Sequence, residues 1–149
     1  MKVIVDINPK LSEAEVHLYV PKENQSTKEI IRQLHSLFDT WQLAAFKKDE
    51  LVYLALDEIL FFETEGRNVL VHTRNETLLV KHKLYELEKL NSNFMRISKA
   101  SVLNISQVEG LKRSFSGCMA SFFESYKSVY VSRKYYPNLR DKLEEMRLK

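Results

Sequence analysis

Two short segments of this chain combine cations with small hydroxyl side chains, residue types that suit contacts with nucleic acid. The first is residues 98–101 (SKAS), and the second is residues 132–134 (SRK). An arginine can donate two parallel hydrogen bonds to O6 and N7 of a guanine, a contact that discriminates between bases by about 1–3 kcal/mol. Lysine and serine suit phosphate oxygens, which fix the register of a complex but carry little sequence information. Both segments are therefore candidate DNA contacts.

Positive charge is concentrated in the part of the chain that contains both segments. Between residues 92 and 140 there are eight Lys or Arg and two acids, a balance of +6, whereas the whole chain of 149 residues carries +3. A local excess of this kind is typical of a surface that binds a polyanion. A single arginine on a turn between strands is more often an ordinary solvated residue, so charge alone leaves both interpretations open.

The residue types needed for other chemistry are scattered. The four histidines lack metal-ligand spacing, the three glycines form no phosphate-binding loop, and no serine lies in a Gly-x-Ser-x-Gly turn. The single cysteine, Cys118, excludes an internal disulfide and is expected to be a packing residue. The chain shows neither a signal peptide nor an apolar run of the roughly eighteen residues that span a bilayer. We therefore expect a cytoplasmic protein that is not an enzyme and uses no cofactor, metal or small-molecule substrate.

Short strands are predicted to carry the candidate segments. Charged or turn-forming residues separate a series of apolar runs, which predicts a meander of antiparallel strands. The runs are residues 51–56, 59–64, 69–73, 77–80, 102–105, 107–115, 120–123 and 128–131. Residues 83–90 have helical spacing, a basic turn is expected between them and the strand at residue 102, and Pro137 predicts the start of a C-terminal helix. The predicted fold class is mainly β, within the α+β class.

The first forty-five residues have a different pattern. Residues 2–7 and 15–20 alternate apolar and polar residues, which predicts a small β-hairpin. Ser26 and Glu29 have the spacing of a capping box. The helical stripe that follows consists of Ile30, Ile31, Leu34, Leu37 and Phe38. We therefore divide the chain into a β-β-α extension, residues 1–45, and a basic domain, residues 46–149.

Four linked motifs resemble the LytTR-type DNA-binding domain of bacterial transcription regulators. They are ILFFE at residues 59–63, LYELE at 84–88, FMRISK with VLN at 94–104, and VSR at 131–133. The resemblance covers residues 46–146. It implies about ten short strands in stacked antiparallel sheets, with one internal and one C-terminal helix, and loop side chains that reach successive major grooves of duplex DNA.

The resemblance also assigns base-reading positions to three turns. The loop after the Phe-Phe-Glu strand supplies Arg67 or Asn68, the turn after the Phe-x-Arg motif supplies Lys99, and the Ser-Arg turn supplies Arg133, which has the strongest claim. Neighbouring hydroxyls and a lysine are expected to contact phosphates. The candidate DNA-binding residues are thus Arg67, Asn68, Ser98, Lys99, Ser101, Ser132, Arg133 and Lys134.

Other cations and aromatic residues have alternative interpretations. Arg96 is expected to be a partly buried ion-pair partner of Glu63 or Glu88. Three cations, Lys112, Arg113 and Lys127, are interpreted as solvated residues at strand edges. Most aromatic residues are expected in the core. Near the Ser-Arg turn, the side chains of Tyr130, Tyr135 and Tyr136 could instead line the DNA backbone.

The expected function is sequence-specific transcription regulation. The resemblance extends to the stand-alone subgroup of the family, which lacks a receiver domain and whose members are often paired with a membrane-bound inhibitory protein. A homodimer that binds repeated half-sites in double-stranded promoter DNA is therefore expected. One alternative stays open, a protein-protein interaction module without specific DNA binding. In that case the extension, residues 1–45, would mediate dimer formation or bind the inhibitory partner.

Overall fold

The computed structural model describes residues 2–11, 15–38 and 42–147, without the side chains of residues 35–38. Contacts between residues divide the chain into two units, Met1–His35 and Ser36–Lys149. Each unit is described by itself. The predicted contributions of Leu37 and Phe38 to a helical stripe lie outside the described residues.

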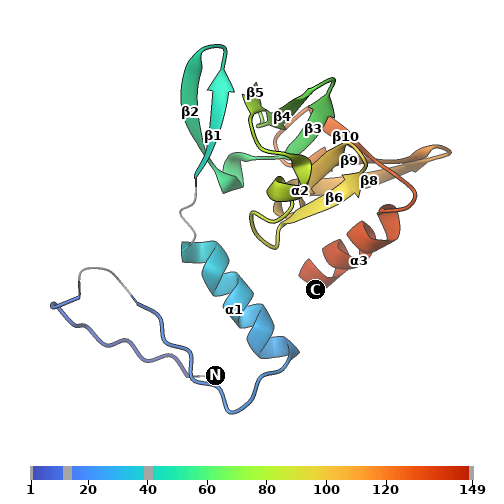
Figure 1. Cartoon of the computed structure of the whole chain (residues 1–149). Helices are drawn as coiled ribbons and strands as arrows, with labels where there is room; N and C mark the ends of the chain where they lie inside the picture. The colour runs from blue at the N-terminus through green and yellow to red at the C-terminus, as the bar shows by residue number, and fades with distance from the viewer. Residues whose placement is uncertain (1, 12–14, 39–41, 148–149) are drawn as a thin grey trace. The chain divides into compact units, whose positions relative to one another are not determined.

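Within residues 42–147, the second unit contains ten antiparallel strands in two sheets (Figure 1). The strands are β1 (Gln42–Lys47), β2 (Glu50–Ala55), β3 (Phe61–Glu65), β4 (Asn68–His72), β5 (Thr77–Val80), β6 (Phe94–Ser98), β7 (Ser101–Asn104), β8 (Val108–Ser114), β9 (Gly117–Phe122) and β10 (Ser128–Val131). The larger sheet has the order β2-β1-β5-β4-β3-β7-β6 and the smaller one β10-β9-β8. Helices α2 (Leu84–Leu87) and α3 (Tyr136–Met146) follow β5 and β10, and short 3-10 helices span Leu56–Glu58 and Ile105–Gln107. The predicted mainly β fold with an internal and a C-terminal helix is confirmed.

The centre of the larger sheet is buried on both faces. Successive residues of a strand point to opposite faces, so Phe62 packs in one core with Leu87 of α2, whereas Phe61 packs in a second core. That second core includes Phe122 of the smaller sheet and Leu139 of α3. Burial on both faces explains why residues 59–62, which lead into β3, form a continuous apolar run and do not alternate with polar residues.

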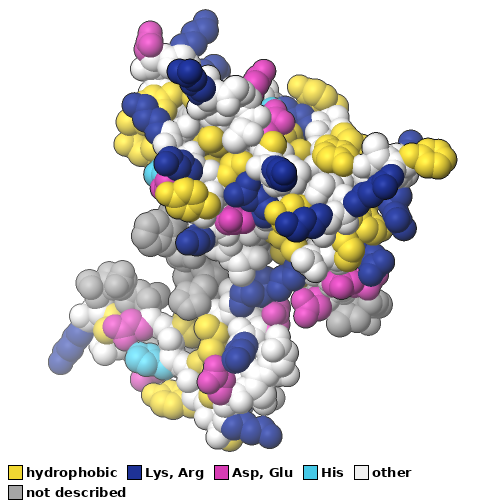
Figure 2. Space-filling view, turned by 45° about the vertical axis from the view of Figure 1, so that its right-hand side comes forward, with side chains coloured by type: hydrophobic (Ala, Val, Ile, Leu, Met, Phe, Trp, Pro, Cys, Tyr) yellow, Lys and Arg dark blue, Asp and Glu magenta, His cyan; other side chains and the backbone are white. Residues whose placement is uncertain are grey.

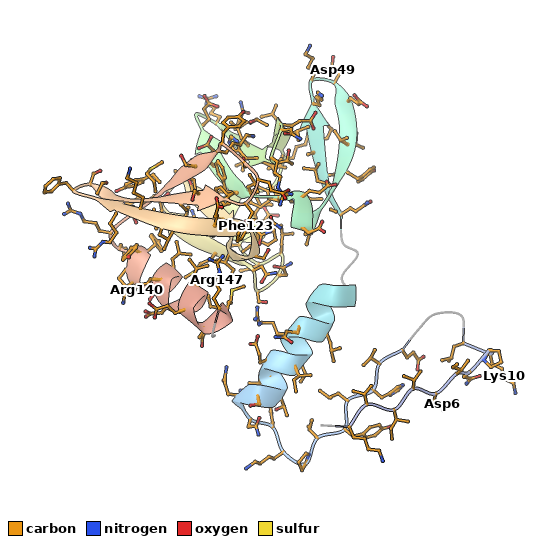
Figure 3. All side chains as sticks on the ribbon, turned by 180° about the vertical axis from the view of Figure 1, so that it is seen from behind. Asp6, Lys10, Asp49, Phe123, Arg140 and Arg147 are labelled. Carbon is orange, nitrogen blue, oxygen red and sulfur yellow. The ribbon has the colours of Figure 1, made fainter. Side chains whose placement is uncertain are left out.

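The smaller sheet is closed by the C-terminal helix. Leu139 of α3 is fully buried and Leu143 nearly so. At the end of α3, the guanidinium of Arg147 donates a hydrogen bond to the carbonyl of Val108 and lies 5.6 Å from the ring centre of Phe123 (Figure 3). The predicted packing role of Cys118 is also confirmed, because its side chain is buried in the same core.

Three elements of the second unit differ from the predictions. Residues 94–98 form strand β6 beside β7, where no strand was predicted, and the predicted basic turn follows this strand at Lys99. The pairing of β6 with β7 shifts register between Arg96 and Ser98, which marks a β-bulge. Ile97 and Ser98 are consequently both buried, and the alternation that signals a strand is lost. Helix α2 is also shorter than the predicted residues 83–90, and β1 was not among the predicted strands.

The predicted β-hairpin of the first unit is wrong as well. No strand is assigned in residues 2–11 or 15–24. The apolar residues of both segments are exposed, with exposed fractions of 79% for Val3, 87% for Ile7 and 90% for Tyr19. Figure 3 shows the side chains of residues 2–11, with Asp6 and Lys10 labelled, standing away from the backbone. Alternation favours a strand only where one face becomes buried against something, and in this unit both segments remain uncovered.

Helix α1 (Gln25–Phe38) is confirmed, but it starts earlier than the predicted cap. The N-cap is Asn24, whose Oδ1 accepts a hydrogen bond from the Thr27 amide at 3.0 Å, while Thr27 Oγ1 accepts one from the Asn24 amide at 2.8 Å. This reciprocal arrangement satisfies two amide groups of the first turn. Ser26 and Glu29, the predicted box, therefore lie inside the helix, where Glu29 pairs with Arg32.

A polar cluster joins the larger sheet to the loop before β10. His72 Nε2 lies 2.7 Å from Glu63 Oε1, and the His72 ring stacks on Phe61 with 4.1 Å between ring centres. Lys127 Nζ lies 3.3 Å from His72 Nδ1 and donates to Thr77 Oγ1 at 3.2 Å. The interpretation of Lys127 as a solvated residue is therefore wrong. Burial lowers the pKa of His72 below its ordinary value, against the opposing effect of Glu63, and the charge of Lys127 lowers it further.

Acidification is expected to destabilise the second unit in part through His72. Because the folded chain holds the pKa of His72 below 6.5, the unfolded chain binds that proton more tightly. The stability contributed by the neutral ring is therefore complete above pH 6.5 and is lost as the pH falls below it. Urea unfolding of wild type and His72→Gln at a series of pH values measures this. An identical loss of stability with falling pH in both proteins would exclude His72 as a source.

Candidate nucleic-acid interface

Three turns of the second unit are connected by backbone hydrogen bonds. They are the β3–β4 turn, the β6–β7 turn and the turn between β10 and α3. The amide of Thr64, near the end of β3, donates to the carbonyl of Ala100 at 2.8 Å, and the amide of Ser132 donates to the carbonyl of Ile97 at 2.9 Å. The β6–β7 hairpin is thus joined to both other turns. The three-turn surface consists of residues 66–68, 98–101 and 132–134.

The β3–β4 turn is a two-residue hairpin loop that exposes Arg67. Glu65 pairs with Asn68 across the turn, and Gly66 has φ +61°, a left-handed conformation that favours glycine. Arg67 and Asn68 are both exposed. The turn therefore presents a guanidinium and an amide, the two side-chain types that pair bidentately with guanine and adenine.

The side chain of Arg96 holds the backbone of the β6–β7 turn. Its Nη1 donates a hydrogen bond to the carbonyl of Lys99 at 2.9 Å, and its Nε lies 3.5 Å from Glu88 Oε2. Ser98 Oγ accepts a hydrogen bond from the amide of Ala100 at 3.2 Å. The prediction of a partly buried ion pair for Arg96 is confirmed with Glu88, whereas Glu63 pairs with His72. These contacts fix the backbone of Lys99 and leave its side chain exposed.

Removal of the Arg96 contacts is expected to affect DNA binding without removing a DNA contact. Arg96→Met is expected to lower the free energy of unfolding by about 1–3 kcal/mol, the range for hydrogen bonds to charged groups. It should also weaken binding of a specific duplex more than binding of a scrambled one, because the Lys99 turn loses its fixed backbone. Urea unfolding and fluorescence anisotropy measure the two effects. The matched control is Arg113→Met, on the exposed part of β8, and equal DNA affinities for the two variants would contradict the positioning role.

The turn between β10 and α3 exposes two adjacent cations. The carbonyl of Ser132 accepts hydrogen bonds from the amides of Tyr135 and Tyr136 at 3.1 and 3.0 Å, which curls the chain into α3. Arg133 and Lys134 are exposed at the tip. Lys134 Nζ lies 5.4 Å from the ring centre of Tyr135.

The nearby tyrosines have partners within the chain. The guanidiniums of Arg113 and Arg140 lie 4.9 and 5.8 Å from the ring centre of Tyr136. Tyr130 donates a hydrogen bond to the carbonyl of Ser116 at 2.7 Å. Their contact with a DNA backbone stays a prediction.

The eight predicted site residues belong to these three turns and lie in two environments. Arg67, Asn68, Lys99, Arg133 and Lys134 are exposed. The serines are not: Ser98 and Ser101 are buried, and the hydroxyl of Ser132 is buried without a hydrogen-bond partner among the described residues. Contacts of these three serines with phosphates stay a prediction. They require the serine hydroxyls to turn toward solvent. The hydrogen bond from Arg96 to the carbonyl of Lys99 was not predicted, because no sequence spacing signals a hydrogen bond to a backbone carbonyl.

The wider surface is cationic but not continuously so. On the face in Figure 2, Lys and Arg side chains form separate groups with apolar side chains between them. Among the described residues, no group of His, Cys, Asp and Glu side chains is placed to hold a metal ion. None of the described helices is long and apolar enough to cross a bilayer. The arrangement can donate hydrogen bonds and neutralise negative charge.

Comparison with known proteins gives a family, relatives and a similar fold. The family model described as the LytTr DNA-binding domain matches residues 49–144. Uncharacterized HTH-type transcriptional regulators of Staphylococcus aureus strains bovine RF122 / ET3-1 and MSSA476 are each 28% identical over 144 residues, which is 96% of this chain and 98% of theirs. The LytTr DNA-binding domain of a Bacillus cereus protein described as a methyl-accepting/DNA response regulator superimposes with a TM-score of 0.62 at 19% identity, over 68% of this chain and 95% of that one.

The fold of residues 42–147 differs from the helix-turn-helix arrangement after which these relatives are named. An HTH-type regulator inserts the second of two consecutive helices into the major groove. In residues 42–147 no two helices are consecutive, since five strands separate the four-residue α2 from α3. Base contacts by this unit would therefore have to come from side chains on turns.

Proposed function

Because this chain belongs to the LytTr DNA-binding domain family, we propose that it regulates transcription by sequence-specific binding to double-stranded promoter DNA through the three-turn surface. The observation that carries this proposal is the connection of three turns, each with an exposed hydrogen-bonding side chain, by two backbone hydrogen bonds. Arg133 reads a guanine, Arg67 or Asn68 reads a second position, and Lys99 contacts a base edge or a phosphate. The protein acts as a DNA-binding regulator in the cytoplasm and not as an enzyme.

The protein binds as a homodimer on repeated half-sites. The three turns of one protomer contact few base pairs. Two copies double both the number of contacts and the length of DNA sequence that is recognised. The spacing of the half-sites then follows the helical repeat of DNA, because both copies approach the same face of the duplex.

A protein-binding role for the extension is compatible with this function. The exposed apolar residues of segments 2–7 and 15–20 favour a protein partner for the first unit. A membrane-bound inhibitory protein as that partner stays a prediction. An interaction module without specific DNA binding is the second candidate function, and the same observation favours it.

Selection of duplexes from a random library by the full-length protein tests the function. We expect enrichment of repeated half-sites, and anisotropy titrations in which the logarithm of the affinity falls linearly with the logarithm of the salt concentration, as phosphate contacts require. A pool without an enriched sequence, together with equal affinity for any duplex, would support the interaction module instead.

A further inference from the structure

Residues 2–6 are symmetric about Ile4 in a way that suits pairing with a second copy of the same segment. The sequence reads Lys2-Val3-Ile4-Val5-Asp6, with identical residues next to the centre and opposite charges at the two ends. We propose that this segment pairs with itself as an antiparallel strand across a two-fold axis at Ile4, and so joins two copies of the chain. This inference rests on the proposed function in one respect, because the pairing supplies the second protomer that repeated half-sites require.

The antiparallel register centred on Ile4 places complementary residues opposite each other. Each Lys2 faces the Asp6 of the second copy, and each Val3 faces its Val5. A two-fold interface repeats both pairs, as an isologous contact must. Cross-strand ion pairs and β-branched pairs are each favourable in an antiparallel ladder, while like charges directly opposite are unfavourable. The charges therefore select this register over its neighbours.

The same pairing gives the ribbon one apolar face. Residues two apart in a strand point to the same side, so Val3, Val5 and Ile7 of both copies gather on one face and the charged residues on the other. Val16, Leu18 and Val20 of the following segment have the same spacing and can extend that face. All of these residues are exposed in the isolated chain, and no strand is assigned to either segment there.

The exposed apolar area is as large as a dimer interface requires. The exposed apolar residues of segments 2–11 and 15–20 present an area on the order of 1,000 Å² per copy. The largest apolar patch of a typical monomer is roughly 300–600 Å². A standard protein–protein interface buries about 800 Å² per partner. A unit of 35 residues is also too small to bury a core alone, and oligomerisation is a usual remedy. Burial supplies the affinity, and the ion pairs supply the register.

The charge of the first unit favours a second copy over an anionic surface. Residues 1–35 contain five Lys or Arg and five Asp or Glu, a net charge of zero. Two neutral units do not repel each other, and neither is attracted to lipid headgroups or to DNA. A copy of the same chain is thus the occupant that matches both the charge pattern and the symmetry.

Charge reversal in the full-length protein tests the pairing by sedimentation velocity over a concentration series. Asp6→Lys places like charges opposite each other twice and is expected to raise the dimer dissociation constant by about tenfold. The double variant Lys2→Asp/Asp6→Lys restores opposite charges and should return it to the wild-type value. Glu23→Lys, an equal charge change at an exposed position outside the paired residues, is the matched control. A monomeric wild type, an Asp6→Lys variant as dimeric as wild type, or a double variant that is not rescued would each overturn the proposal.

Cysteine cross-linking tests the position of the axis. With Cys118 buried, Ile4→Cys is expected to give a covalent dimer on mild oxidation, because the two introduced thiols face each other. Ile7→Cys, three residues off the axis, should cross-link much more slowly. Equal rates for the two variants would overturn the register.

The apolar contribution is tested with Val5→Lys, which is expected to weaken the dimer by about a hundredfold or more, since two apolar pairs are lost. A monomeric variant should still bind a single half-site with wild-type affinity and lose only the gain on a repeated site. A wild-type protein that does not bind a single half-site would instead count against the proposed function. Failure of the pairing proposal and failure of the proposed function therefore give different results.

Discussion

Replacement of Arg133 by alanine is expected to remove most of the sequence discrimination and to leave the fold intact. Arg133 is exposed at the tip of its turn. The backbone of that turn is held by hydrogen bonds of the Ser132 main chain, so truncation of the arginine removes no packing. One bidentate contact with guanine is worth about 1–3 kcal/mol, and each half-site loses one. Anisotropy titration of a selected site and a scrambled duplex measures the ratio of the two affinities, which should fall by about tenfold to a hundredfold per half-site.

The control for Arg133→Ala separates charge from base reading. Arg140→Ala removes the same charge from an exposed position of α3 to which no base-reading role is assigned. It should weaken both duplexes alike or neither. Lys134→Ala should likewise reduce affinity for both duplexes and flatten the salt dependence. Equal losses on both duplexes for Arg133→Ala would mean that this residue contacts phosphate and does not read a base.

The second large effect is expected at Asn104, which is buried at the end of β7. Its Nδ2 donates to the carbonyls of Ile59 at 2.9 Å and Leu56 at 3.3 Å. Its Oδ1 accepts from the amide of Ser106 at 3.1 Å and from the Ser106 hydroxyl at 2.6 Å. Asn104→Ala strands the carbonyls of the buried residues Ile59 and Leu56, each at a cost of about 1–3 kcal/mol, whereas the groups of the exposed Ser106 can bind water. We expect a loss of about 3 kcal/mol or more from a total that is ordinarily about 5–15 kcal/mol.

Asn104→Asp provides a control of equal shape. The introduced carboxylate faces two carbonyl oxygens that need a donor, so its pKa in the folded chain should lie above the ordinary value for aspartate. The penalty is then complete at neutral pH and shrinks as the pH falls and the carboxyl becomes protonated. Urea unfolding of the variant and of wild type at neutral and mildly acidic pH gives the difference. A penalty that does not change with pH would exclude the donor role of the amide.

The sequence was sufficient where a residue's environment follows from its neighbours in the chain. The apolar runs around Phe61, Leu78 and Val129 predicted strands that the structure contains. A partly buried ion pair of Arg96 with Glu63 or Glu88 was also expected, because Arg96 follows Phe94 in a motif shared with the family, and the structure contains the pair with Glu88.

Where the prediction was wrong, contacts distant in sequence decided the structure. In β6, the bulge at Ile97 buries two successive residues against β7 and the β10–α3 turn, and no local pattern encodes that. At the start of α1, Asn24 and Thr27 provide a complete box before the predicted one at Ser26. In residues 2–7 the alternation is genuine, but a strand also needs a neighbour, and none of the described residues forms a strand beside this segment. The site residues depended on the family resemblance for their selection, since an exposed arginine has no signature of its own.

Under the proposed function, the hydrogen bond between Ser132 and Ile97 would limit how base recognition can change. Substitution of the exposed side chains at the turn tips would change which bases are read. The distance between those side chains depends on the pairing of β3 with β7 and on the contact of β6 with the β10–α3 turn. A shift of one residue in the pairing of β3 with β7 would turn core side chains outward. Variants of this chain would therefore change the identity of the bases that they read more easily than the distances between those bases.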